Sequence, residues 1–313
     1  MSETAVVLVN LGTPNSPNPS DVKKYLIEFL TDKRVIDQPW LKRQLLVRGI
    51  IVPRRYRDSS KAYKRVWTEE GSPLLSWGKK TKCLLQESLG DDFQVELAMR
   101  YQSPSIEDAL SKVKGCKHLI VIPLFPQYAS ATSGSVTEKV MHTIKDWECL
   151  PKLSFIGSYP DHPLMIDAFC QQAKETPWQN YDQVLFSFHG LPVRQANKQP
   201  YEADCRATAS AIVKKLKIPN ERWSLTFQSR LGNDPWLEPF TQDKICELGR
   251  EGKKILVFSP SFVCDCLETT DELGYEYRNE FIELGGKRFD VVPGLNANPL
   301  WIQALRSLVL STY

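Results

Sequence analysis

Short runs of β-branched and other apolar residues alternate with longer amphipathic segments along the whole chain, and this alternation constrains the fold more than any other feature. Several runs are continuously apolar, as in the LIVIPL of 119–124, which is typical of strands buried on both faces of a parallel sheet. Helical patterns lie between most of the runs. The sequence therefore predicts an α/β fold with strands at 5–10, 93–99, 118–124, 153–157, 183–188, 223–228, 254–259 and 289–292.

Eight strands with helical connections fit two doubly wound domains of about four strands each better than one large sheet. The two halves repeat a strand–loop–helix rhythm at similar lengths, and 313 residues suffice for two domains. We expect the junction at 146–151, where a helical pattern ends in a short connector with a proline, which gives domains 1–148 and 149–298. Residues 299–313 are expected to contain an amphipathic helix that packs back on the first domain.

The composition excludes several classes of protein. With 42% hydrophobic and 25% charged residues, the chain is neither disordered nor fibrous. No run approaches the roughly 18 consecutive apolar residues of a membrane span, and the N-terminus lacks the features of a signal peptide. We therefore expect a soluble, cytoplasmic protein. Its net charge of +3 does not indicate a dedicated nucleic-acid binder.

The eight cysteines are scattered and contain no C-x-x-C pair, so most are expected to be core residues or free thiols. Only Cys264 and Cys266 are close enough in sequence to remain a candidate ligand group.

Ligands of open α/β sheets bind at the carboxyl ends of the strands, so the residues that follow each run are the candidates for a site. The first strand is followed by NLGTP at 10–14, which lacks the glycine patterns of dinucleotide and P-loop proteins. The second ends in Arg100 and Tyr101, a cation and an aromatic ring at a strand tip. The hydroxyl-rich loop at 125–135 fits either an anion site or a capped helix entry.

Among the four histidines, His189 alone sits where a buried strand reaches the expected crevice. It is followed by Gly190, which we expect to let a ligand approach the backbone. An imidazole there can accept a proton near neutral pH or bind a metal ion. A satisfied core histidine is the alternative.

Four glutamates, Glu268, Glu272, Glu276 and Glu280, recur every four residues and would form one drifting stripe on a helix. Like charges at that spacing oppose one another by about 0.2–0.5 kcal/mol per pair, so the stripe needs compensating partners or a use. It is either a solvated face or a row that passes protons or guides a divalent cation.

Six motifs occur together in the order found in ferrochelatases, and the resemblance runs from residue 5 to the C-terminus. They are NLGTP at 10–14, FPQY at 125–128, SFHGLP at 187–192, QSR at 228–230 with WL at 236–237, DCLET at 265–269 and NANP at 296–299. The resemblance implies two Rossmann-like, chelatase-type domains, each a mainly four-stranded parallel sheet flanked by helices. It also implies a lyase that inserts Fe²⁺ into a porphyrin in haem biosynthesis.

The resemblance assigns roles position by position. His189 matches the active-site histidine of the family and Glu268 the carboxylate that faces it, both also as metal contacts. Glu272 and Glu276 continue the acidic row as a proton or metal path. Around the porphyrin it places Leu11, Arg55, Tyr63, Ser72, Arg100, Tyr101, Tyr128 and Tyr159. Phe125 replaces a tyrosine common elsewhere in the family. Some members carry a [2Fe–2S] cluster on a cysteine-rich tail or insertion; this chain has neither, so we expect no cofactor beyond the substrate Fe²⁺.

A basic segment with apolar residues extends from Trp40 to Arg65 and contains nine Lys or Arg residues against one acid, Asp58. Its net charge of +8 leaves −5 for the rest of the chain. Such a segment can lie on an anionic membrane surface, bind carboxylates or nucleic acid, or be an ordinary solvated helix. Given the resemblance, we expect a lip over the porphyrin cleft that also touches a membrane peripherally, and no nucleic-acid partner.

Protoporphyrin IX is the expected porphyrin, on account of the apolar lip and the FHG form of the histidine motif. Coproporphyrin III, with four propionates instead of two, is the alternative substrate. A non-catalytic tetrapyrrole or metal carrier is an alternative of another class, and the presence of both His189 and Glu268 argues against it.

Overall fold

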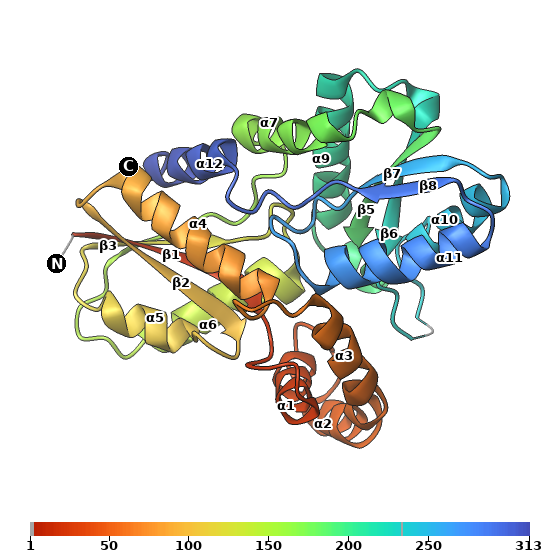
Figure 1. The fold of residues 1–313 in the computed structure, drawn as a ribbon. Helices are drawn as coiled ribbons and strands as arrows, with labels where there is room; N and C mark the ends of the chain where they lie inside the picture. The colour runs from red at the N-terminus through yellow and green to blue at the C-terminus, as the bar shows by residue number, and fades with distance from the viewer. Residues whose placement is uncertain (1–2, 233) are drawn as a thin grey trace. The chain divides into compact units, whose positions relative to one another are not determined.

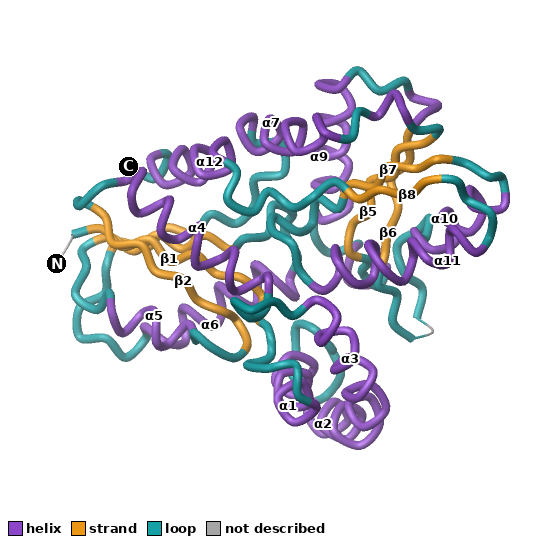
Figure 2. The backbone as a smooth tube through the Cα atoms, viewed as in Figure 1, coloured by secondary structure: helices purple, strands orange, loops and turns teal. Residues whose placement is uncertain are grey.

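The computed structural model describes residues 3–232 and 234–313, and the chain divides into two compact units (Figures 1 and 2). Unit 1 comprises Met1–Phe125, Ser130–Gly157 and Leu305–Tyr313, and unit 2 comprises Pro126–Ala129 and Ser158–Ala304. Each unit contains one four-stranded, all-parallel sheet with helices around it. This confirms the predicted fold class.

Unit 1 has the strand order β2-β1-β3-β4. Its strands are β1 (Thr4–Gly12), β2 (Phe93–Tyr101), β3 (His118–Pro123) and β4 (Lys152–Phe155). All six residues of β3 are buried, and the five after His118 are apolar, as expected for a strand covered on both faces. The helices are α1 (Pro19–Leu30), α2 (Trp40–Leu46), η1 (Val47–Ile51), α3 (Val52–Val66), α4 (Pro73–Leu89), α5 (Ile106–Lys112), η2 (Ser130–Gly134) and α6 (Ser135–Ile144).

Unit 2 repeats the same order as β6-β5-β7-β8. Its strands are β5 (Gln183–His189), β6 (Trp223–Gln228), β7 (Lys254–Phe258) and β8 (Arg288–Val291). The helices are α7 (Pro163–Gln172), η3 (Ala173–Glu175), η4 (Trp178–Asn180), α8 (Val193–Ala196), α9 (Tyr201–Leu216), η5 (Asn220–Arg222), α10 (Thr241–Arg250), η6 (Glu268–Tyr277) and α11 (Arg278–Glu283). The last helix of the chain is α12 (Pro299–Leu310).

The boundary between the units differs from the expected junction at 146–151. β4 pairs in parallel with β3 from His118↔Lys152 to Val121↔Phe155, so the chain leaves unit 1 only after Gly157. The connector at 146–151 is therefore a loop within unit 1. The final residues also belong to unit 1, where the Tyr313 hydroxyl lies 2.5 Å from Thr4 Oγ1.

Three helical segments, η1, η2 and η6, are π-helices. π-Helices occur mostly as single-turn bulges and frequently at functional sites. The 10 residues of η6 make it much longer than such a bulge, and it contains three of the four glutamates of the acidic row. Among the described residues, no helix is both long and apolar enough to cross a membrane.

Candidate active site

The strand order of unit 2 creates a topological switch point between β5 and β7, where ligands of open α/β sheets bind. β5 ends at His189, and the segment that follows β7 lies against it. The His189 backbone N–H donates to Ser261 Oγ over 3.1 Å, and the Phe262 ring meets the imidazole edge-on at 6.3 Å between centroids. The fold therefore brings the predicted histidine next to the loop that leads into Glu268.

A hydrogen bond determines the tautomer of the half-buried His189 ring. Nδ1 lies 2.8 Å from the Gly190 carbonyl oxygen. A carbonyl oxygen only accepts hydrogen bonds, so Nδ1 carries the hydrogen of the neutral ring and Nε2 carries the lone pair. Within the described parts of the chain Nε2 has no hydrogen-bond partner, which argues against a satisfied core histidine. Nε2 is the atom able to accept a proton or bind a metal ion.

Two residues without a local sequence signal hold the backbone of His189. The Tyr201 hydroxyl donates to the His189 carbonyl oxygen over 2.7 Å and lies 3.2 Å from Ser261 Oγ. Burial raises the pKa of Tyr201 well above its ordinary value, so its hydroxyl remains a donor. Tyr201 and Ser261 are 12 and 72 residues from His189 in sequence, so only the fold reveals this support.

Gly190 is required for a different reason from the one the sequence suggests. Its N–H donates to the Gln228 carbonyl oxygen over 2.8 Å. A Cβ atom at this position would lie 2.8 Å from that oxygen and 3.1 Å from the Trp236 ring. The glycine therefore lets β6 and Trp236 approach the end of β5, and the space expected for a ligand is filled by protein.

Glu268 begins the π-helix η6 and is half-buried. Just before it, Cys266 is buried, and its burial together with the charge of Glu268 raises the pKa of the thiol well above its ordinary value. Metal ligation needs the thiolate. The raised pKa disfavours the thiolate form of Cys266.

The sequence suggests that Glu272 is an unpaired carboxylate of the acidic row, but the structure gives it four hydrogen-bond donors. Its carboxylate accepts hydrogen bonds from Gln228 Nε2 (3.0 Å), Ser229 N (3.0 Å), Ser229 Oγ (2.6 Å) and the Tyr277 hydroxyl (3.0 Å). Gln228 is the register partner of His189 in the β5–β6 pair. Gln228 thus connects the strand tip that bears His189 to the π-helix that bears the acidic row.

The other two carboxylates of the row have different surroundings. Glu276 is exposed on η6. Glu280 lies in α11, where it accepts hydrogen bonds from Gln242 Nε2 (3.0 Å) and Cys246 Sγ (3.3 Å) of α10. The sequence-predicted stripe therefore ends at Glu276, and Glu280 connects two helices.

The two predicted tyrosines of unit 2 are held by neighbouring groups. The Tyr128 backbone N–H donates to Asp204 Oδ2 over 3.0 Å, and Ser158 Oγ donates to the same oxygen over 2.7 Å. Tyr159 is only 5% exposed and stacks on Trp301 with 6.2 Å between ring centroids. Burial raises the pKa of Tyr159 above its ordinary range, so its hydroxyl stays protonated.

In unit 1, Arg100 and Tyr101 are tied to Asp32, a residue that sequence reasoning missed. Asp32 Oδ2 accepts from Arg100 Nη2 (2.7 Å), the Tyr101 hydroxyl (2.9 Å) and Ser135 Oγ (2.6 Å), and its Oδ1 accepts from the Arg34 backbone N–H (2.8 Å). Burial by itself would raise the pKa of Asp32, but these donors and the charge of Arg100 outweigh it and lower the pKa. The side-chain partners lie 68 to 103 residues away, so no local pattern predicts them.

The remaining predicted porphyrin contacts of unit 1 differ in exposure. Leu11 is half-buried against the core of the sheet. Ser72 is buried and accepts a hydrogen bond from Thr13 Oγ1 over 2.8 Å. Tyr63 is buried with an edge-on contact to Tyr25, whereas Arg55 is exposed on α3.

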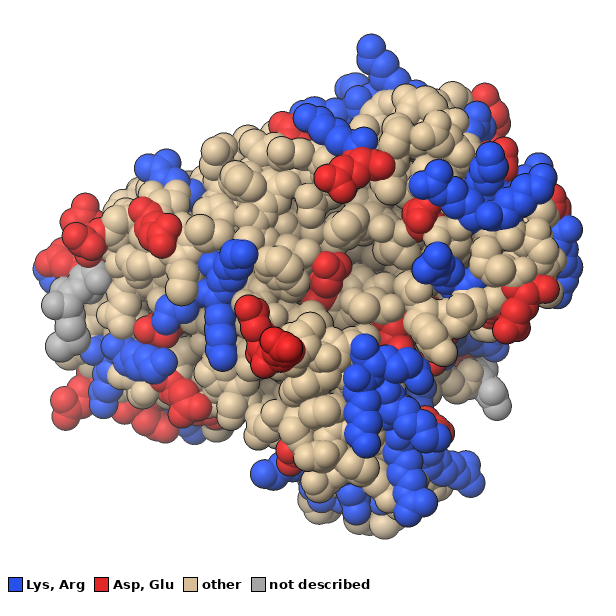
Figure 3. Space-filling model, viewed as in Figure 1, with Lys and Arg blue, Asp and Glu red and all other residues tan. Residues whose placement is uncertain are grey.

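The basic lip, residues 40–65, forms α2, η1 and α3, and its cations gather over these helices (Figure 3). Three of its apolar residues are also exposed: Trp40 at 68%, Leu41 at 62% and Leu45 at 65%. One cation is an exception. Arg43 is buried and donates to the backbone carbonyls of Thr31, Ile36 and Gln38, so it stabilises a loop and adds nothing to the exposed basic surface.

The fold resembles solved structures of chelatases. The structure of SirB from Bacillus subtilis with Fe³⁺ matches with a TM-score of 0.59 and 13% identity, covering 100% of this chain and 96% of that one. That of CbiX, described as the terminal enzyme for siroheme biosynthesis in denitrifying bacteria, matches with a TM-score of 0.52, 13% identity and 99% coverage of both chains. At these identities the likeness shows the chelatase-type fold.

Sequence comparison identifies the family. The ferrochelatase family model matches residues 3–313. The ferrochelatase of Legionella pneumophila strain Paris is 40% identical over 324 residues, covering 97% of this chain and 98% of the relative. That of Yersinia enterocolitica is 40% identical over 315 residues, covering 98% and 97%. The chain belongs to the ferrochelatase family, whose members insert a metal into a porphyrin in haem synthesis.

Proposed function

We propose that this ferrochelatase inserts Fe²⁺ into protoporphyrin IX and releases two pyrrole protons to give protohaem. The observation that carries the proposal is the Nε2 lone pair of His189, unpaired within the described residues, at the switch point of unit 2. A free-base porphyrin holds two N–H protons where the metal must bind, so insertion requires a proton acceptor beside the ring. Neutral imidazole meets that requirement.

The surrounding residues keep that imidazole in place. Tyr201 and Ser261 fix the backbone of His189, and the Gly190 carbonyl keeps the hydrogen on Nδ1. A proton arriving at Nε2 gives an imidazolium that retains the Nδ1–H donor bond. His189 therefore accepts a pyrrole proton or contacts the metal without losing its orientation.

Glu268 is the proposed partner of His189 in proton and metal handling. It lies at the start of η6, directly after the loop that contacts His189. Glu272, held by its four hydrogen bonds, contributes a fixed negative charge next in the row, and the exposed Glu276 leads toward solvent. The three carboxylates attract an incoming cation and provide acceptors for departing protons.

We propose that the enzyme uses Fe²⁺ as substrate and carries no resident [2Fe–2S] cluster. In the described part of the chain no three His, Cys, Asp or Glu side chains are grouped to hold a metal ion by themselves. A porphyrin supplies four nitrogen ligands, so a metal in transit needs few from the protein.

The basic lip supports protoporphyrin as the substrate and a peripheral contact with the membrane from the cytoplasmic side, and the proposal includes no nucleic acid. Exposed indole and leucine side chains beside Arg and Lys suit an anionic lipid surface. They also suit protoporphyrin IX, with its large apolar ring and two carboxylates, better than coproporphyrin III, which has four carboxylates.

The test of the chemistry is an anaerobic assay with Fe²⁺ and either protoporphyrin IX or coproporphyrin III. We expect wild type to metallate protoporphyrin faster, and His189→Ala and Glu268→Ala to lower kcat by about 10²-fold or more. The exposed His142→Ala and Glu283→Ala serve as matched controls with wild-type rates. Full activity in either site variant contradicts the assigned roles, and a preference for coproporphyrin contradicts the substrate.

The membrane contact is tested by flotation with liposomes that contain anionic lipid. Arg54→Glu with Arg55→Glu should reduce the bound fraction several-fold, because each cation near such a surface contributes about 1 kcal/mol. Lys174→Glu with Lys217→Glu makes the same charge change at exposed positions of unit 2 and should have little effect. Equal flotation of the two double variants rules out docking through the lip.

A further inference from the structure

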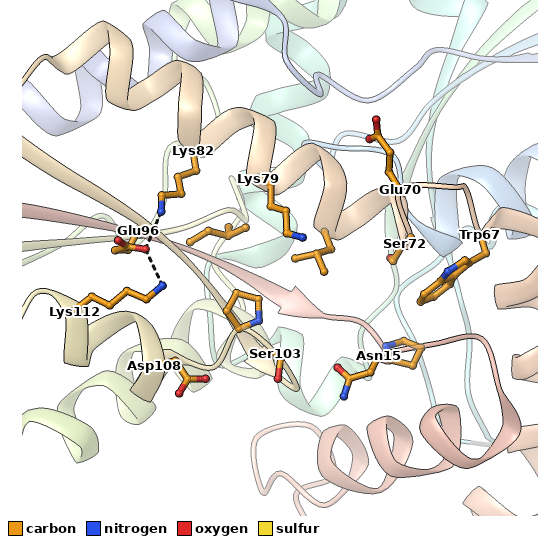
Figure 4. A pocket seen from close by; sticks show the side chains of 15 residues that line it. Asn15, Trp67, Glu70, Ser72, Lys79, Lys82, Glu96, Ser103, Asp108 and Lys112 are labelled. Atoms are coloured by element: carbon orange, nitrogen blue, oxygen red, sulfur yellow. Dashed lines mark hydrogen bonds and ion pairs between the residues drawn. The ribbon is translucent and has the colours of Figure 1, made fainter.

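Unit 1 contains a cavity at the open edge of its sheet. β2 is an edge strand of this sheet, and the cavity lies along it, with walls from α4 and α5 (Figure 4). Its volume is about 640 Å³, within the range of about 300–1,000 Å³ typical of small-molecule sites. Much of the lining is apolar and comes from Pro14, Trp67, Leu75, Leu97 and Pro104. A space of this size and lining accommodates a flat organic molecule.

One end of the cavity has a buried carboxylate shared by two lysines. Glu96 Oε2 lies 2.9 Å from Lys82 Nζ and 3.4 Å from Lys112 Nζ, and the Glu96 side chain is only 9% exposed. Burial by itself would raise the pKa of Glu96, but the two ammonium groups outweigh it and lower the pKa. One negative charge thus faces two positive charges. Each ammonium group also keeps N–H donors that Glu96 does not use.

A third lysine adds to this excess. Lys79 lies on α4 three residues before Lys82, on the same helix face, and has no ion-pair partner within residues 3–232 and 234–313. Its ammonium group points in among the lining residues in Figure 4. The lining therefore has three ammonium groups: two contact Glu96, and the third belongs to the exposed Lys79.

The two remaining acids of the lining lie apart from the Lys79 ammonium group (Figure 4). Asp108 accepts from the Ser105 backbone N–H in the capping box of α5, and its charge interacts with that of Lys112. The Glu70 carboxylate points away from the other lining side chains (Figure 4). The lining thus has three lysines and three acids, and Lys79 is the lysine to which the described residues give no ion pair.

We propose that this cavity binds an organic anion, with its carboxylate or phosphate among Lys79, Lys82 and Lys112 and its apolar body against Trp67 and Leu97. The inference does not depend on the proton chemistry of unit 2. Two sources share the ligand chemistry: a propionate of the porphyrin substrate and a separate small metabolite.

Two fluorescent probes of similar shape test the proposal. 8-Anilinonaphthalene-1-sulfonate is a flat aromatic anion, and N-phenyl-1-naphthylamine is its neutral counterpart. Lys79→Ala should weaken binding of the anion about tenfold, the equivalent of one charge-assisted hydrogen bond, and leave the neutral probe unaffected. Lys80→Ala is the matched control, because Lys80 is the next residue of α4, packs over Trp77 at 5.2 Å and does not line the cavity.

Glu96→Gln should act in the opposite direction and tighten binding of the anion several-fold, because it removes the carboxylate that competes for the lysines. The Lys79 comparison stands even where this buried substitution unfolds the protein. Equal anion affinities of the Lys79→Ala and Lys80→Ala variants overturn the proposal, as does an equal loss for both probes.

Steady-state kinetics distinguish the two sources. A raised KM for porphyrin with unchanged kcat in Lys79→Ala identifies the anion as a substrate propionate. An unchanged KM, together with the weakened probe, identifies a separate ligand. The probe titration does not require turnover, so a failure of the proposed metal insertion leaves this result readable.

Discussion

Removing the Asp32 carboxylate should destabilise unit 1 by about 3 kcal/mol. The Asp32 side chain is 7% exposed, and Asp32→Ala leaves Arg100, 16% exposed, without its counter-ion. Breaking a buried pair from one side costs about 3–5 kcal/mol. We expect the lower end of that range, because Arg100 Nε keeps its hydrogen bond to Ser135 Oγ. The buried Tyr101 hydroxyl, which loses its acceptor, contributes to the cost.

Amide hydrogen exchange measures this change in unit 1 by itself. A loss of about 3 kcal/mol corresponds to roughly hundredfold faster exchange of the protected β1 and β2 amides. Asp58→Ala is the control, because it removes an exposed ion pair to Lys61, and such surface pairs contribute little to stability. If β1 and β2 exchange in Asp32→Ala no faster than in Asp58→Ala, the cluster does not stabilise the sheet.

The stability difference between wild type and Asp32→Ala should depend on pH in a defined way. The pKa of Asp32 is lower in the folded chain than its ordinary value of 3.8, so the unfolded chain binds the proton more readily. The stabilisation by Asp32 is therefore fully present above pH 3.8 and is lost as the pH falls through the lower folded pKa. The difference between wild type and Asp32→Ala should be constant from pH 5 to 7 and shrink under acid conditions; a difference that grows on acidification refutes the assigned ionisation.

Two further predictions follow from the packing of unit 2 and from thiol burial. Gly190→Ala should lower activity and reduce the free energy of unfolding by about 1–3 kcal/mol, because its Cβ would lie 2.8 Å from the Gln228 carbonyl oxygen. The control is Gly49→Ala, which adds a methyl group to open space, and similar melting temperatures for the two variants contradict the prediction. At pH 8, a disulfide reagent should modify the exposed Cys83 and Cys149 quickly and leave the buried Cys205, Cys264 and Cys266 unmodified until unfolding, and rapid labelling of Cys266 would show that its thiol is accessible.

The sheets and the position of His189 could be predicted from the sequence because both depend on local patterns. A continuously apolar run of six residues has few alternatives to a strand buried on both faces, and β3 is such a strand. His189 follows a run of this kind, and the carboxyl end of a parallel strand is where α/β ligands bind. The histidine directly follows the strand pattern in the sequence, so its position at the strand end could be predicted without knowledge of tertiary contacts.

Features that depend on distant partners could not be predicted. Arg43 contributes to the basic pattern of 40–65, yet its guanidinium satisfies carbonyls of the preceding loop. Glu272 has the same spacing as its neighbours in the row, yet donors from β6 and from Ser229 occupy its carboxylate. A spacing of four residues also fits an α-helix and a π-helix almost equally, so the pattern could not reveal η6. In each case the deciding atoms come from another element.

The two units share one strand order, so topology alone predicts a ligand crevice at β1/β3 in unit 1 and another at β5/β7 in unit 2. Side-chain chemistry distinguishes them. The end of β5 has an imidazole with a lone pair, and the segment after β7 leads to carboxylates; both are groups that exchange protons and metal ions. Unit 1 instead supplies arginines, lysines and hydroxyls, including Arg55 and Ser72, which bind anions but do not accept protons near neutral pH. We therefore assign the proposed insertion step to unit 2 and expect anion binding in unit 1.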